Sequence, residues 1–196
     1  HAGAACLNLA KFDAGAAVSL IAEKKATVMF DFAPILGALL DQSDEEGRDI
    51  STLRKVIGLD SPDTIVRYQN TTGGTFYSFF GQTETSCLTT VSRYNDRPGS
   101  AGRPVLAAEV RLVDDDDRPV GDGETGEIVV RGPLVFKGYI NLPQDTAQTF
   151  RNDWHHTGDL GRFDRDGFLF YMGRKPDKEL IKPGGENVYP AEVEDA

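Results

Sequence analysis

The first 80 residues alternate between patterns that are typical of helices and patterns that are typical of strands. Apolar residues recur at helical spacing after Asp13, a plausible helix cap, and again after Pro34. Short apolar runs at 27–30 and 53–57 separate these segments and predict buried strands. Strands that alternate with helices pair in parallel through helical crossovers, so we expect an α/β fold that contains part of a parallel sheet with flanking helices.

A third helix is expected to begin at Ser61-Pro62, a cap followed by proline, and to end at Gly73-Gly74. The run Thr75 to Phe80 predicts another strand, and Gly81-Gln82-Thr83-Glu84 follows it directly. In open α/β sheets, ligands bind just beyond the carboxyl ends of strands. This stretch is therefore either a ligand-binding turn or an ordinary polar turn at the end of a strand.

From about residue 98 onward, the pattern changes to that of an antiparallel β subdomain. The runs 109–113 and 127–131 predict strands joined by an acidic, glycine-rich connection. The runs 160–164 and 168–172 flank Asp166-Gly167, which is a strong hairpin signal. We expect a small barrel here. The aspartates at 114–117 lack the spaced ligands of a calcium loop, so a solvated turn is the expected structure.

Charge and composition exclude some classes of partner. The chain of 196 residues has 21 basic and 31 acidic side chains, a net charge of −10 and a pI near 4.7. Nucleic acids and anionic membranes require basic patches, so neither is an expected partner, although a local nucleotide pocket is still possible. No apolar run approaches the ~20 residues that span a bilayer, and we expect a cytoplasmic protein.

The two cysteines and the two adjacent histidines do not indicate a metal site. Cys6 and Cys87 show no metal or redox spacing and are interpreted as structural or incidental thiols. Nothing near His155-His156 completes a coordination set, so these histidines are expected to flank the following turn structurally.

Four short motifs follow one another along the chain. They are Phe80-Gly-Gln-Thr-Glu84, Thr157-Gly158-Asp159, Gly173-Arg174 and Ile181-Lys182-Pro-Gly-Gly185. Each is weak alone, since Gly-Arg is common by chance and Asp159 ahead of a hairpin is also typical of a structural Asx turn. The order and spacing of the four motifs are more specific than any one of them.

In that order the motifs resemble those of the adenylate-forming superfamily, which includes acyl-CoA synthetases, adenylation domains of peptide synthetases and luciferases. The segment 51–62 is similar to the family segment that borders the adenine, which makes Gly58, Ser61 and Pro62 candidate nucleotide-binding residues. The run 185–190 resembles the family motif that follows the hinge to the C-terminal domain, in the version found in acyl-CoA synthetases. Further matches are Gly102-Arg103-Pro104, Gly126-Glu127-Ile128, Arg131-Gly132-Pro133 and Gly138-Tyr139.

The resemblance implies a two-step reaction. A carboxylic acid attacks the α-phosphate of ATP to give acyl-AMP and pyrophosphate, and the acyl group then passes to a thiol, usually that of coenzyme A. The alternatives are an adenylation domain or acyl-AMP ligase that supplies a carrier protein, and a noncatalytic nucleotide-binding remnant. The partners implied are thus a small carboxylic acid, ATP and coenzyme A.

The same resemblance assigns roles to individual residues. Phe80 would lie near the adenine, beside Gly81 and Gln82, where glycine lets the backbone approach a ligand closely. Thr83 would donate to the α-phosphate, and Glu84 would bind Mg²⁺. Asp159 would accept from the ribose hydroxyls, and Arg174 would donate to ribose or phosphate oxygens through its planar guanidinium.

A hinge to a small C-terminal domain is implied after Gly173-Arg174. The chain appears two residues longer there than the family pattern, and alignment favours Lys178 as the hinge residue over Pro176, whose φ is restricted. Lys182 and Gly185 would face the nucleotide or the thiol. The other interpretation of these lysines is a solvated charged linker. We therefore expect an incomplete α/β subdomain over 1–97, an antiparallel subdomain over 98–173, and a hinge with the start of a further domain over 174–196.

Two parts of the family pattern do not occur in the sequence. These are the Ser/Thr/Gly-rich phosphate loop and the catalytic lysine of the C-terminal domain. The chain also opens at His1 without an initiator methionine, so we interpret it as a fragment that does not turn over substrate alone. The acid is not legible, although residues 76–79 would either line an apolar or aromatic pocket or belong to the core.

Overall fold

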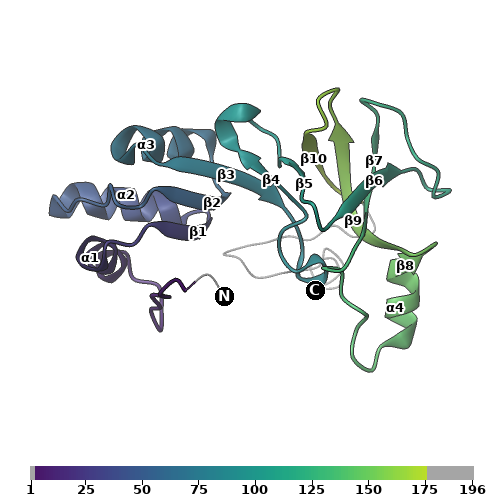
Figure 1. Ribbon diagram of the computed structural model, residues 1–196, viewed down its shortest axis with the longest axis horizontal. Coiled ribbons are helices and arrows are strands. Elements are labelled where there is room, and N and C mark those ends of the chain that lie inside the picture. The colour runs from purple at the N-terminus through teal and green to yellow at the C-terminus, as the bar shows by residue number, and fades with distance from the viewer. Residues whose placement is uncertain (1–2, 176–196) are drawn as a thin grey trace, which may run out of the picture. The chain divides into compact units, whose positions relative to one another are not determined.

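The computed structural model describes residues 3–175, shown with its secondary structure in Figure 1. The described residues fall into two compact units, one containing residues up to 79 with 92–99, the other containing 80–91 and the chain from 100 onward. In chain order the helices and strands are α1 (Ala14–Lys24), β1 (Val28–Phe32), α2 (Ile35–Glu46), β2 (Lys55–Leu59), α3 (Pro62–Thr72), β3 (Thr75–Phe80), β4 (Thr90–Arg93), β5 (Arg103–Pro104), β6 (Glu109–Val113), β7 (Thr125–Arg131), α4 (Pro143–Thr149), β8 (Phe150–Arg151), β9 (Trp154–Phe163) and β10 (Leu169–Arg174).

The first unit contains the predicted parallel sheet. Strand β2 lies between β1 and β3 and pairs with both in parallel. Asp13 caps α1 by accepting the Ala16 amide at 2.8 Å, and Ser61 caps α3 by accepting the Thr64 amide, with Pro62 in the first turn. The predicted caps are thus confirmed. The strand expected at 53–57 instead begins at Lys55, because the backbone of Leu53 turns back to Ile50.

One face of this sheet is covered by the three helices. Helix α2 packs against α1, α3 and β1 (Figure 1). Their apolar stripes and alternate strand residues form one buried core, which contains Val18, Leu39, Val56, Tyr68 and Phe76. Because side chains of a strand alternate between its two faces, the residues between these core positions lie on the other face.

That other face is apolar and open in the described structure. Val28, Phe30, Phe32 and Leu59 are each about half exposed. Phe79 contacts Phe30 and Phe32 edge to face, with ring centroids 6.4 and 6.0 Å apart. We call these five residues the open face of the first unit.

The second unit contains an antiparallel sheet with the strand order β10-β9-β7-β6, to which β8 is added beside β9 (Figure 1). The predicted hairpin is confirmed, since β9 and β10 pair on either side of Asp166-Gly167. The sheet is a curled half-barrel rather than a closed barrel, because β6 and β10 stand at opposite ends of the strand order. Its core includes Phe80, Leu112, Ile128, Val130 and Leu169.

Strand β9 differs from the expectation, because it begins at Trp154 and therefore includes Thr157-Gly158-Asp159. The β7–β9 register is irregular between Glu127 and Val129, where two steps along β7 oppose four along β9. The sequence analysis also did not predict β4, β5, β8 or α4. No helix in residues 3–175 is long and apolar enough to cross a bilayer.

Candidate functional site

The Thr157-Gly158-Asp159 segment is held in an irregular stretch of β9. Gly158 has a φ of 71°, in the left-handed region that glycine adopts without strain. Its amide donates to Glu127 Oε1 at 3.1 Å. Thr157 Oγ1 donates to the Ile128 carbonyl at 2.7 Å and accepts the Asp159 amide at 3.1 Å. The position of Asp159 is thus fixed by its own backbone and by β7.

The Asp159 carboxylate is the centre of a polar cluster in the second unit. It is only 5% exposed, and Gln82 Nε2 donates to its Oδ2. Tyr171 Oη donates to Oδ1 at 3.3 Å, and Arg174 Nε lies 3.5 Å from the same oxygen. Arg174 is directly opposite Asp159 in the β9–β10 pairing. The predicted residues Gln82, Asp159 and Arg174 therefore come together.

An aromatic pair lies beside this cluster. The rings of Phe80 and Tyr171 are stacked, with centroids 6.3 Å apart and an interplanar angle of 27°. Phe80 is 7% exposed, whereas Tyr171 is 48% exposed. Burial, together with the neighbouring Asp159 charge, raises the pKa of Tyr171 to about 12, so its hydroxyl stays a hydrogen-bond donor at neutral pH. The motifs did not identify Tyr171, although it lies in β10 three residues before Arg174.

A tight turn connects Phe80 to Glu84. A Cβ on Gly81 would overlap the Cys87 carbonyl, so the close approach of the two backbone segments requires glycine. The Gln82 amide donates to Thr85 Oγ1 at 2.9 Å, and the turn continues as a single 3₁₀ turn over Thr83–Thr85. Thr83 is exposed at this turn.

Glu84 is half-buried, and its Oε1 accepts the Tyr139 hydroxyl at 2.9 Å. The side chain is a hard oxygen ligand of the kind that Mg²⁺ prefers. Among residues 3–175 no group of three or more His, Cys, Asp or Glu residues could hold a metal. A single carboxylate such as that of Glu84 suits Mg²⁺, which usually keeps several waters and binds one or two carboxylates together with substrate phosphates.

Comparisons with known proteins identify the family of the chain. A family model described as AMP-binding enzyme matches residues 1–140, which is more than half of the chain. The chain belongs to the AMP-binding enzyme family. It is 41% identical over 200 residues to the medium/long-chain-fatty-acid–CoA ligase FadD8 of Mycobacterium tuberculosis, a match that covers 98% of this chain and 35% of the relative.

Solved structures give the same result for the fold. A putative long-chain-fatty-acid CoA ligase from Rhodopseudomonas palustris superposes with a TM-score of 0.80 at 54% identity, covering 84% of this chain and 42% of that one. The O-succinylbenzoate coenzyme A synthetase MenE from Bacillus subtilis, solved with ATP and magnesium ion, superposes with a TM-score of 0.75 at 30% identity, covering 94% and 39%. The chain thus spans less than half the length of these relatives.

Other predicted site residues of this AMP-binding family member belong to the first unit or lie outside the described residues. Gly58 is buried in β2 of the first unit, where a Cβ would overlap the Asp31 carbonyl, and Ser61 and Pro62 begin α3 in that unit. The hinge candidates Lys178 and Pro176, together with Lys182 and Gly185, lie outside the described residues. Of the aromatic run, Phe76 belongs to the helix-covered core, whereas Phe79 belongs to the open face.

Glu127 is a buried acid that the motifs matched without assigning a function. Its Oε2 lies 3.2 Å from His156 Nδ1 and 3.4 Å from Lys175 Nζ. Burial by itself raises the pKa of Glu127, but the hydrogen bond and charge of His156, the charge of Lys175 and the Gly158 amide outweigh burial and hold the pKa at about 2. Glu127 therefore stays ionised and anchors the backbone just before Asp159.

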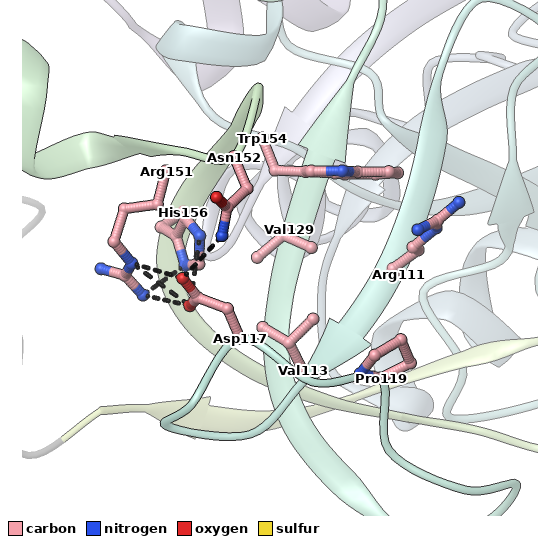
Figure 2. Close-up of a pocket in the computed structure, with 9 residues that line it drawn as sticks. All are labelled: Arg111, Val113, Asp117, Pro119, Val129, Arg151, Asn152, Trp154 and His156. Carbon is pink, nitrogen blue, oxygen red and sulfur yellow. Dashed lines mark hydrogen bonds and ion pairs between the residues drawn. The ribbon is translucent and has the colours of Figure 1, made fainter.

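A hollow of about 160 Å³ lies on the sheet near His156, lined by residues of β6–β9 and the 114–120 loop (Figure 2). Asp117 pairs there with Arg151 Nη2 at 2.9 Å and accepts Asn152 Nδ2 at 3.3 Å. The Arg111 guanidinium lies 4.6 Å from the Trp154 ring centroid. Arg151 Nη2 also lies 2.7 Å from His156 Nδ1 and 3.6 Å from Glu127 Oε2, so this arginine links the hollow to the buried acid.

Proposed function

We propose that this chain is part of a longer acid–CoA ligase that activates a carboxylic acid with ATP. The acid oxygen attacks the α-phosphorus of ATP, the bond to the bridging oxygen breaks, and pyrophosphate leaves with that oxygen. The thiol sulfur of coenzyme A then attacks the acyl carbon, AMP leaves, and the thiol proton passes to solvent. The observation that carries the proposal is the cluster of Gln82, Asp159, Tyr171 and Arg174 beside the Phe80 ring.

This cluster suits recognition of an adenosine nucleotide. A carboxylate accepts hydrogen bonds from two neighbouring hydroxyls, and bonds to a charged acceptor are roughly twice as strong as neutral ones. Asp159 would thus hold the ribose. The Arg174 side chain is 27% exposed, so its guanidinium would donate to a ribose or phosphate oxygen. The Phe80–Tyr171 pair offers a flat apolar surface for the adenine.

Thr83 and Glu84 would act at the phosphates. Thr83 is an exposed hydroxyl at the end of the turn that begins at Gly81, and it would donate to an α-phosphate oxygen. Glu84 would bind Mg²⁺, which supplies charge compensation for the triphosphate when bound. Tyr139 donates to Glu84 and orients its carboxylate. Lys182 would supply further positive charge at the nucleotide or the thiol.

The test uses the longer enzyme with ATP, Mg²⁺ and a panel of aliphatic and aromatic acids, with and without coenzyme A. We expect acid-dependent release of pyrophosphate, and an acyl thioester only when coenzyme A is present. Release without a CoA thioester would replace the proposal with transfer to a carrier protein. No release with any acid would overturn it in favour of a noncatalytic nucleotide-binding protein.

Asp159 should contribute directly to the affinity for AMP. Asp159→Ala removes the acceptor for two hydroxyls, so we expect AMP affinity to fall by at least ~10-fold, since hydrogen bonds to charged groups contribute about 1.5–3 kcal/mol each. Calorimetric titration with AMP measures this change. The matched control is Asp122→Asn, an exposed aspartate of the same unit, which should bind AMP like the wild type. Equal affinity of Asp159→Ala and wild type would remove Asp159 from the site.

A further inference from the structure

His155 is buried beside the Asp159 cluster, although the sequence indicated only a structural role for it. The side chain is 2% exposed and its Nε2 lies 3.2 Å from Gln82 Oε1. The rings of Phe136 and Phe150 pack against it, with centroids 5.5 and 5.7 Å away. The imidazole is thus held by two aromatic rings on one part of its surface and by an amide oxygen at Nε2.

The contacts of Gln82 fix the orientation of its amide group. Nε2 donates to the Thr157 carbonyl at 2.9 Å and also to Asp159 Oδ2. Both partners are acceptors only, so the amide nitrogen must face them and Oε1 must face His155. A flipped amide would place Gln82 Oε1, an acceptor, against the Thr157 carbonyl oxygen and Asp159 Oδ2, which are also acceptors. Two hydrogen bonds in a buried site would then be lost.

The contacts of His155 fix its tautomer in turn. Because Gln82 Oε1 can only accept, Nε2 of His155 must carry the hydrogen. Nδ1 is buried and has no hydrogen-bond partner in the described part of the chain. A second proton on Nδ1 would thus be buried without an acceptor, and burial lowers the pKa of His155 below its ordinary value. The neutral Nε2–H imidazole is therefore the form that this site holds.

These contacts form one directed chain from a buried imidazole to a carboxylate. His155 donates to Gln82, and Gln82 donates to Asp159 and to the carbonyl two residues before it. We propose that His155 is a positioning residue that acts through Gln82 to hold the Asp159 carboxylate in the orientation that receives the ribose hydroxyls. This inference rests on the proposed function, and it gives Gln82 an indirect role, through Asp159, instead of direct nucleotide contact.

The experiment measures how strongly the longer enzyme prefers AMP over 2′,3′-dideoxy-AMP, which lacks both ribose hydroxyls. The variant His155→Phe keeps a ring between Phe136 and Phe150 but removes the donor. We expect it to lower the preference for AMP by ~5-fold, the equivalent of one net hydrogen bond, with the affinity for dideoxy-AMP changed less than twofold. His155→Gln, which retains a donor, should restore part of the preference.

A second variant tests the same chain of contacts at its middle. Gln82→Met has a side chain of similar length with no amide, so it should lower the preference for AMP at least as much as His155→Phe. This variant decides the question if His155→Phe does not fold. A general weakening of the fold would lower the affinity for both nucleotides and leave their ratio unchanged.

The outcomes separate this inference from the proposed function. A wild-type preference for AMP that disappears in Asp159→Ala but persists fully in His155→Phe and Gln82→Met would overturn the positioning role alone. A wild type that binds neither nucleotide would overturn the nucleotide site and the positioning role together. A smaller preference for AMP over 2′,3′-dideoxy-AMP in both His155→Phe and Gln82→Met, with partial recovery of this preference in His155→Gln, supports the proposal.

Discussion

Asp31, within β1, and Asp60, directly after the neighbouring strand β2, are two carboxylates of the first unit that lack a donor between them. Asp31 is fully buried, with Oδ1 accepting the Leu36 amide at 3.0 Å, and Asp60 Oδ1 accepts the Ser61 amide at 2.6 Å. Oδ2 of each is buried without a hydrogen bond. Burial, followed by the charge of Asp60, raises the pKa of Asp31 to about 7. At neutral pH the Asp31 carboxyl is therefore ionised in only a fraction of the molecules, and in that fraction the buried charge is unfavourable.

This pKa has a definite consequence for the free energy of unfolding. Because the folded state keeps a proton that the unfolded state releases above about pH 4, the contribution of Asp31 falls as pH rises from about 4 to about 7. Asp31→Asn retains the acceptor for Leu36 and gives Asp60 a donor. We expect the variant to be more stable than wild type by about 1–4 kcal/mol at pH 8, with a smaller difference at pH 5.

Chemical denaturation of the 196-residue chain at the two pH values checks this expectation. Glu45→Gln, which changes an exposed carboxylate of α2, is the matched control and should behave like wild type at both. An Asp31→Asn advantage that does not change between pH 5 and pH 8 would contradict the assignment of the raised pKa.

The pKa of Glu127 is lowered, whereas that of Asp31 is raised. Its pKa lies at about 2, below the ordinary value of 4.5, so its contribution to the free energy of unfolding is present above about pH 4.5 and is lost as pH falls toward 2. Glu127→Gln should destabilise the chain by about 2–3 kcal/mol at pH 7, with the difference from wild type shrinking in acid. Acid titration followed by circular dichroism measures it, with Asp122→Asn as control. A pH-independent difference would show that packing, and not charge, is lost.

At this scale the sequence motifs identified only part of the cluster. They located Gln82, Asp159 and Arg174, which the structure brings together. The sequence did not identify Tyr171 and indicated only a structural role for His155, because the contacts of both depend on the β9–β10 register and on the irregular stretch of β9, which periodicity does not reveal. The position of His155 in the sequence, next to a motif, does not indicate that its side chain contacts Gln82.

At the scale of elements, the turn between β3 and the 3₁₀ turn depends on one glycine. The Cys87 carbonyl occupies the space where a Cβ of residue 81 would lie, and both groups are backbone. Neither can move without opening the turn that carries Gln82, Thr83 and Glu84. We expect Gly81→Ala to cost more than about 2 kcal/mol in the free energy of unfolding, in the range of strained backbone substitutions.

A second glycine substitution provides the control. Gly37 lies within α2, where a Cβ would meet nothing closer than 4.0 Å, so Gly37→Ala should raise the free energy of unfolding by about 0.5–1 kcal/mol. Urea denaturation of both variants separates the clash at residue 81 from the general effect of replacing glycine. Equal effects of the two substitutions would be inconsistent with the turn geometry described above.

The elements themselves were largely predictable where local chemistry determines them. The helix caps at Asp13 and Ser61 and the strand Thr75–Phe80 follow from side-chain capping and from β-rich composition. The short strands β5 and β8 have two residues each, too few for any periodicity, and are defined only by the strands they pair with. Helix α4 spans seven mostly polar residues with none buried, so it has no apolar stripe to detect.

At the scale of the whole molecule, the open face of the first unit is an apolar surface that a chain of net charge −10 leaves exposed in the described structure. Contiguous apolar patches of this kind promote association. We expect the 196-residue chain to self-associate, and the double change Phe30→Ser with Phe32→Ser to reduce association. Sedimentation velocity over a range of concentrations measures this. Val66→Ser on α3, another exposed apolar residue, is the control. A monodisperse wild type would refute the expectation.

The fold class was predictable at this scale because each half has a consistent pattern: alternating elements in the first and a hairpin in the second. The curled antiparallel sheet was predictable as well, whereas the extent of its closure, a half-barrel, depends on whether edge strands meet. Membership of the AMP-binding family follows from the matched residues.

Hydrogen bonds hold both peptide groups that flank the Gly158 Cα. The Gly158 N–H is bound by Glu127, and the Gly158 C=O accepts the Lys175 amide at 2.9 Å, directly after the Gly173-Arg174 pair. A rotation of the backbone at Lys175 would therefore act, through this one hydrogen bond, on the peptide plane between Gly158 and Asp159, while Glu127 holds the peptide plane before it.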